Sequence, residues 1–176
     1  MATKHKLMKA IFTCQMKVDI ETSLIKKSVL QKKATMLIPQ EFILMDAKTI
    51  ALKYPSAGHR PSEVHTNPEG TINIALNHTK NAASEADLEK VKKTMDTQFN
   101  IPSINFIKSE IKEINGRKFI VIEFVSQAAD TKIYNLMAIT SLEGRLAMIT
   151  FNCTNFHRKV WVPIGKKVIE SIYVKP

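Results

Sequence analysis

Two residues near the C-terminus have the types and the spacing of a nucleophile pair. Cys153 and His157 lie four positions apart, and an imidazole beside a thiol can accept its proton and leave a reactive thiolate. Cys153, however, ends an apolar segment and His157 begins the next one, so the spacing does not imply that the two side chains meet. The sequence favours a buried structural role for Cys153, and equally for Cys14. A hydrolase that uses Cys153 and His157 is the weakest of three functional hypotheses.

Three histidines surround one predicted hairpin and carry another kind of chemistry. His59, His65 and His78 offer neutral imidazole nitrogens, which are good ligands for transition metals. Their spacing matches neither HExxH nor a CxxC-type zinc site. The sequence also contains no glycine-rich phosphate loop and no GxSxG motif. We therefore expect no metal, no cofactor and no enzymatic activity.

Glu123 is an ionisable residue inside the apolar run 119–125. We expect its carboxylate to be partly buried and paired with a lysine or an arginine. A lone carboxylate without an acid or base partner is a poor indication of catalysis, so the expected role is structural.

The turn-rich stretch from Tyr54 to Ser62 is the best candidate for a binding surface. Binding residues lie disproportionately on loops held by a rigid scaffold, and tyrosine and arginine are enriched among interface hot spots. We predict that a partner contacts Tyr54, His59, Arg60 and, on the following segment, His65. The alternative is that Tyr54 closes the preceding helix against the core and that Arg60 is merely solvated.

Capping signals and apolar stripes locate the helices that would support this loop. Asp46 can cap a helix that runs to Tyr54. Ser84 and Asp87 resemble a capping box, and the apolar stripe of an amphipathic helix follows them. A C-terminal helix is predicted through residues 160–171.

Alternation of apolar and polar residues and the turn dipeptides Asn115-Gly116 and Glu143-Gly144 locate the strands. The predicted extended segments are residues 12–20, 29–38, 63–66, 71–77, 104–114, 117–125, 132–142 and 145–153, and residues 23–27 are predicted to form a short turn of helix. Three of the later strands are apolar on both faces and must be covered on both faces. The sequence therefore predicts an α+β fold, a three-layer α/β/α sandwich around a mostly antiparallel sheet.

Size and composition are those of an ordinary globular domain. The chain has 176 residues, of which 44% are hydrophobic and 24% are charged. We divide it into a basic N-terminal extension with one strand at residues 1–28 and a single domain at residues 29–176.

We expect no export signal and no membrane span, because no apolar stretch is long enough. The two cysteines form no CxxC motif and suit a reducing compartment, so the cytoplasm is the expected location.

The charge is concentrated at the N-terminus. Lysine and arginine number 26 against 16 acidic residues, and the net charge is +10. Eight lysines and two acidic residues lie within the first 33 positions. Such a segment can bind nucleic acid or an acidic partner, or it can simply keep the protein soluble. A nucleic-acid-binding accessory protein that uses this basic N-terminus is the second hypothesis, although Phe12 is the only aromatic residue there.

The order of these features resembles the PsbP-like superfamily. The matching segments are Ile38-Pro39-Gln40-Glu41-Phe42, Lys53-Tyr54-Pro55 with Arg60-Pro61, Glu69-Gly70-Thr71-Ile72-Asn73-Ile74, the meander with its Asn115-Gly116 turn, and Trp161-Val162-Pro163-Ile164 followed by Ser171-Ile172. The resemblance extends over about residues 29–174 and implies an α/β/α sandwich. The basic segment at residues 1–28 departs from it, and we expect neither a lipoprotein signal nor a transit peptide.

Members of this superfamily are mostly binding proteins without catalytic activity, although a shared fold does not identify a partner. The first hypothesis is therefore a cytoplasmic, non-enzymatic protein-binding module. Its specific form would be a chaperone or an immunity-like partner of a secreted effector. The sequence leaves open the identity of the partner and the oligomeric state, including a homodimer.

Overall fold

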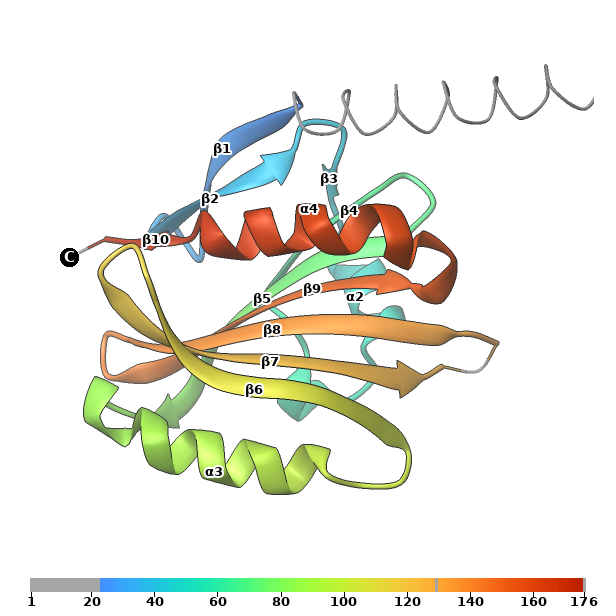
Figure 1. Cartoon of the computed structure of the whole chain (residues 1–176). Helices are drawn as coiled ribbons and strands as arrows, with labels where there is room; N and C mark the ends of the chain where they lie inside the picture. Colours follow the sequence, from blue (N-terminus) through green and yellow to red (C-terminus); the bar gives the residue numbers. More distant parts are fainter. Residues whose placement is uncertain (1–22, 129, 176) are drawn as a thin grey trace, which may run out of the picture.

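The computed structural model describes residues 23–128 and 130–175 (Figure 1). The strand predicted at residues 12–20 lies outside the described residues. With η marking a 3-10 helix, the elements in chain order are β1 (Leu24–Val29), β2 (Ala34–Pro39), β3 (Ile43–Leu44), α2 (Ala47–Lys53), η1 (Ala57–His59), β4 (Glu63–Thr66), β5 (Ile72–Ala82), η2 (Glu85–Asp87), α3 (Leu88–Phe99), β6 (Ile104–Ile114), β7 (Arg117–Gln127), β8 (Lys132–Leu142), β9 (Arg145–Thr154), η3 (Asn155–His157), α4 (Arg158–Glu170) and β10 (Tyr173–Val174).

The strands form two antiparallel sheets. The large sheet has the order β3-β4-β5-β9-β8-β7-β6, and the small sheet has the order β1-β2-β10. The predicted turns Asn115-Gly116 and Glu143-Gly144 connect β6 to β7 and β8 to β9, with φ angles between 50° and 79°. Positive φ at both central residues gives a turn whose twist matches that of the flanking strands. Helices and antiparallel sheets together confirm the predicted α+β class.

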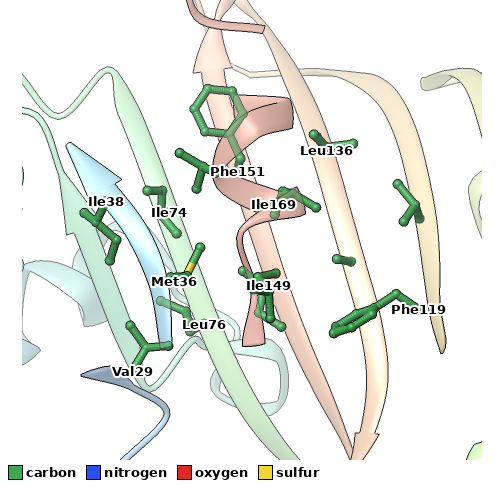
Figure 2. Close-up of a cluster of buried hydrophobic side chains, with 14 of the residues drawn as sticks. Val29, Met36, Ile38, Ile74, Leu76, Phe119, Leu136, Ile149, Phe151 and Ile169 are labelled. Carbon is green, nitrogen blue, oxygen red and sulfur yellow. The ribbon is translucent and has the colours of Figure 1, made fainter. Parts of the chain in front are cut away.

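One face of the large sheet packs against α4 and the small sheet. Figure 2 shows Met36 and Ile38 of β2, Ile74 and Leu76 of β5 and Ile169 of α4 in one core cluster. Each of these side chains is at most 2% exposed. The layer on this face therefore combines a helix with a sheet, whereas the sequence predicted helices alone.

The opposite face packs against α3 and α2. Leu88 of α3 lies in a cluster with Ile120 and Ile122 of β7, and Ile50 of α2 packs on Val64 of β4. Figure 1 shows α3 and α4 on opposite sides of the large sheet. The central strands are thus buried on both faces, as their continuous apolar runs predict.

The predicted caps of α2 and α3 are present. The Asp46 carboxylate accepts the backbone N–H groups of Lys48 and Thr49, each at 3.0 Å. The Asp87 carboxylate accepts the backbone N–H of Ser84 at 2.7 Å and completes the capping box. Among the residues that the structure describes, no helix is long and apolar enough to cross a membrane.

The N-terminal hairpin differs from the prediction. Residues 23–27 were expected to form a turn of helix and residues 29–38 one strand, but β1 and β2 pair as a hairpin. Its turn places Leu30 and the next two residues at positive φ, a conformation that non-glycine residues rarely adopt. The Glu63 carboxylate accepts the Leu30 N–H at 2.9 Å and holds this turn. The domain boundary predicted after residue 28 falls inside β1.

Candidate functional site

A cleft of about 1200 Å³ opens on the face of the large sheet that carries α2 and α3. Strands β5, β9 and β8 form its floor. The residues of α3 line one wall, and the loop from Tyr54 to Pro61 lines the other. The floor is open because α3 packs mainly on β6 and β7, while α2 packs over β4 and β5.

The part of the cleft next to α3 is apolar and rich in methionine. Met137 of β8 and Met148 of β9 lie on the floor, and Met95 and Phe99 of α3 form the adjacent wall. The Phe99 ring is fixed against Phe124 with ring centroids 4.4 Å apart. Methionine side chains are flexible and polarisable, so such a surface adapts to different apolar groups.

The part of the cleft next to the loop is polar. Asn73, Asn152 and Asn135 lie directly opposite one another on the neighbouring strands β5, β9 and β8. The Asn73 amide donates to the Asn152 carbonyl oxygen at 2.9 Å, and the Asn152 side chain hydrogen-bonds to the Tyr54 hydroxyl. Thr150 extends the polar floor. Asn135 and Asn152 of this row bring amide groups into the cleft beside the methionines.

Sequence reasoning missed the asparagine row. Its members lie far apart in the sequence or on different strands, and each one alone is an ordinary polar residue of a strand. Only the register of the three strands brings them together.

Three of the four predicted partner-binding residues lie together on the cleft wall: Tyr54, His59 and Arg60. Tyr54 also caps α2, because its backbone N–H donates to Ile50, and burial raises the pKa of its hydroxyl. The Arg60 guanidinium donates from Nε to the Tyr54 carbonyl at 2.9 Å and from Nη2 to the Pro55 carbonyl at 3.2 Å. Arg60 is therefore not simply solvated, since it braces the loop that it belongs to.

His65, the fourth predicted residue, lies on the other face of the sheet. It is 6% exposed and pairs with Ile74, which belongs to the core under α4. Its Nε2 lies 2.7 Å from Glu63. The structure therefore places His65 outside the cleft.

The charged side chains that line the cleft are mostly positive. Arg60, Lys80 and Lys90 are cationic, and Asp87 is the acidic residue among those that line it. The hydrogen bonds from Ser84 hold the pKa of Asp87 below its usual value and occupy its carboxylate in the capping box. The cleft therefore favours a ligand that carries negative charge.

The structure does not support a Cys153–His157 nucleophile. Cys153 has no exposed surface and lies in the core under α4, and burial raises the pKa of its thiol to about 12. His157 lies in η3 with its ring edge-on to Phe156, at a centroid distance of 5.1 Å. A thiol that stays protonated is not a nucleophile. Within the described ranges, no cluster of His, Cys, Asp and Glu could hold a metal ion.

Glu123 has the predicted structural partner. Its Oε1 lies 3.1 Å from the Lys166 ammonium, and its Oε2 accepts the Tyr134 hydroxyl at 2.8 Å. The Arg158 guanidinium lies over the Tyr134 ring, 5.2 Å from its centroid. These contacts connect α4 to β7 and β8. Burial and the contact with Glu123 raise the pKa of the Tyr134 hydroxyl.

No protein-family model matches the sequence, and no curated protein matches it. Among solved structures, the chain is similar to PsbP of Synechocystis, with a TM-score of 0.59 and 16% identity over 87% of this chain and 93% of that one. It is also similar to LpqN of Mycobacterium tuberculosis, described as involved in cell envelope biogenesis, with a TM-score of 0.55 and 9% identity over 81% and 83%. A protein of Bacteroides thetaiotaomicron gives a TM-score of 0.53 and 14% identity over 86% of this chain and 48% of that one.

The fold is therefore PsbP-like, as the resemblance of the sequence implied. At these low identities the likeness shows the fold alone. A shared fold does not identify a ligand or a partner.

Proposed function

We propose that this protein is a non-enzymatic protein-binding module that holds a helical segment of its partner in the cleft between α2 and α3. The observation that carries the proposal is the part of the large sheet between α2 and α3, where no helix of the described residues covers β9, β8 and the adjoining part of β5 on this face. A cleft of about 1200 Å³ also exceeds the range of about 300–1,000 Å³ that is usual for small-molecule sites.

The spacing of the flanking helices supports a helix as the occupant. α2 lies over β4 and β5 and α3 over β6 and β7, which places them four strand spacings apart in the order of the sheet. At about 4.8 Å per spacing, this separation is about 19 Å. Packed helices lie about 8–10 Å apart, so one further helix fits between α2 and α3.

The lining chemistry defines the kind of helix. Its apolar face would rest on Met137, Met148 and Met95 and on the ring of Phe99. Acidic residues at its border would face the cationic side chains of the cleft, including Arg60. We propose that Tyr54, His59 and Arg60 contact the partner from the loop wall, with the Asn152 amide beside them.

The biological setting that we propose is that of a cytoplasmic chaperone or immunity-like protein whose partner is a secreted effector. The role that we propose requires the protein to bind one segment of another chain, and this fits a cleft that offers hydrophobic, amide and cationic groups. The nucleic-acid alternative depends on the basic N-terminus, of whose eight lysines only Lys26, Lys27, Lys32 and Lys33 lie in the described part of the chain. None of these four lysines lines the cleft.

The test compares Thr150→Trp with Thr131→Trp. Thr150 is a half-buried residue of the cleft floor, and Thr131 is a half-buried residue of the loop between β7 and β8. A phage-displayed library of random peptides about four helical turns long is selected on the wild-type protein. We expect enriched peptides with apolar residues at i, i+3, i+4 and i+7 and with acidic flanks.

The selected peptides should bind Thr150→Trp about tenfold or more weakly, because the indole fills the floor, and should bind Thr131→Trp as they bind the wild type. Thermal unfolding of both variants serves as the folding control. Absence of enrichment, or equal binding to Thr150→Trp, would refute the proposed site. Enriched peptides with apolar residues at every second position would indicate that the cleft holds an extended segment and not a helix.

A further inference from the structure

Strand β6 is the long free edge of the large sheet. The opposite edge, β3, has only two residues, whereas β6 has eleven. β6 pairs with β7 on one side, and in the described part of the chain no strand pairs with its other side. An edge of this length presents a row of backbone donors and acceptors to any strand that can match it.

The regular part of this edge begins after a bulge. The pairing with β7 shifts register between Phe106 and Lys108, and it is then continuous from Lys108 to Ile114. Ile107, at the bulge, is 43% exposed. A bulge blocks pairing locally, so only the segment 108–114 is available to a further strand.

The side chains of this segment alternate in charge on the face that carries α4. Lys108, Glu110 and Lys112 lie opposite Glu123, Val121 and Phe119 of β7, all on that face. Lys108 and Glu110 are 54% and 41% exposed, with their charged groups 2.8 Å apart. An unrelated strand that paired here would bury these charges or place like charges against them. The edge therefore favours a strand whose charge pattern is complementary.

The charge pattern of residues 108–114 is complementary to that of a second copy of the same segment in antiparallel orientation. In a two-fold pair centred on Ile111, Glu110 of each copy lies opposite Lys112 of the other, and Ile111 meets Ile111. Opposite charges directly across an antiparallel pair are stabilising, and like charges are destabilising. A pair centred on Glu110 instead would place glutamate against glutamate and lysine against lysine, and a pair centred on Ser109 would extend into the bulge. The charges and the bulge together therefore select the register.

We propose that two copies of this chain associate through β6, with residues 108–114 paired antiparallel about Ile111 to form one continuous sheet. The two-fold axis of such a pair is perpendicular to the sheet, because paired residues must share a face. Both clefts therefore open on the same side of the dimer, and a partner with two matching segments could occupy both. The dimer does not depend on what the cleft binds.

The experiment uses the charge-reversal variants Glu110→Lys and Lys112→Glu in the full chain. Each variant alone places two like-charge pairs across the two-fold axis. Sedimentation equilibrium should show a dimer for the wild type and a dissociation constant at least about tenfold weaker for each variant. In an equimolar mixture of the two variants, the lysine introduced in one chain would face the glutamate introduced in the other, so a heterodimer should form.

Lys90→Glu is the control, since it changes the charge in the cleft but not on β6, and it should leave the dimer unchanged. Thermal unfolding of each variant excludes loss of fold, because exposed ion pairs contribute little to stability. A monomeric wild type at high protein concentration would overturn the proposal. So would variants that dimerise as the wild type does, or a mixture that fails to restore association.

Discussion

Burial decides which residues of this protein can do chemistry. Cys153 is a nucleophile by type, yet it lies without exposed surface in the core and burial raises its thiol pKa to about 12. Glu123 is only partly buried and keeps two partners, the Lys166 ammonium and the Tyr134 hydroxyl. Removing one partner of such a group leaves the other unpaired, which costs about 1–3 kcal/mol. Glu123 and its partners hold α4 to the sheet, and the proposed binding groups lie in the cleft on the other face of the sheet.

The Cys153 thiol should be unreactive in the folded protein. In a Cys14→Ser background, we expect labelling by a thiol reagent at pH 8 only at the rate of unfolding, and rapid stoichiometric labelling in denaturant. Fast labelling of the folded protein would contradict the burial of this side chain.

The same thiol gives the stability of the domain an alkaline limit. The folded state keeps a proton that the unfolded state releases above pH 9, the usual pKa of the thiol. This contribution is therefore complete at neutral pH and is lost as the pH rises from 9 towards 12. The raised pKa of Tyr134 acts in the same direction.

Helix α4 approaches the sheet closely at Gly165. A Cβ atom at this position would lie 2.3–2.7 Å from the Phe151 ring, and both residues belong to the buried surface between α4 and β9. Glycine inside a helix is normally unfavourable by about 1 kcal/mol relative to alanine. Here the missing side chain is what allows the contact.

Gly165→Ala should therefore destabilise the domain although alanine is the better helix former. We expect a loss of about 1–3 kcal/mol, since the ring or the helix must move to admit the methyl group. Gly58→Ala is the matched control, because a Cβ there meets no atom within 4 Å. Urea denaturation of the two variants gives the comparison, and a Gly165→Ala protein as stable as the wild type would show that α4 can shift without penalty.

The elements that could be predicted from the sequence are those with local signals. Asp46 and Ser84 mark helix starts, and Asn115-Gly116 marks a hairpin, because each acts on backbone groups a few residues away. The β1–β2 hairpin could not be predicted in this way. Its turn contains no glycine and depends on the Glu63 carboxylate, 33 positions from Leu30.

The sequence did not predict the cleft, but it singled out three loop residues that line it, Tyr54, His59 and Arg60. The loop residues Tyr54 and Arg60 carry turn and hot-spot signals that can be read locally. The floor depends instead on the register of three strands and on where α2 and α3 leave the sheet uncovered. Both are consequences of long-range packing, which hydrophobic periodicity does not encode.

The two faces of the large sheet have different consequences for the protein. The side with α4 is closed, because the small sheet and the helix together cover it with one continuous core. In the described residues, the side with α3 is covered at its ends and open over β9, β8 and the adjoining part of β5. Stability can therefore come mainly from the closed side while the open side remains available for a ligand. Substitutions on the two sides should separate folding from binding.

Phe119 and Phe156 provide a test of this closed core with the same chemical change at both sites. Phe119 of β7 is 0% exposed in the cluster under α4, whereas Phe156 of η3 is 89% exposed. Phe119→Asp places a carboxylate in the core without a partner, which costs several kcal/mol unless it is neutralised, a large part of the roughly 5–15 kcal/mol that stabilises a domain. We expect its melting midpoint, followed by circular dichroism, to fall by about 10 °C or more, or cooperative unfolding to disappear. Phe156→Asp should melt within about 2 °C of the wild type. Equal midpoints for the two variants would mean that the sheet is not covered on the α4 side, and the division between a closed and an open face would fail with it.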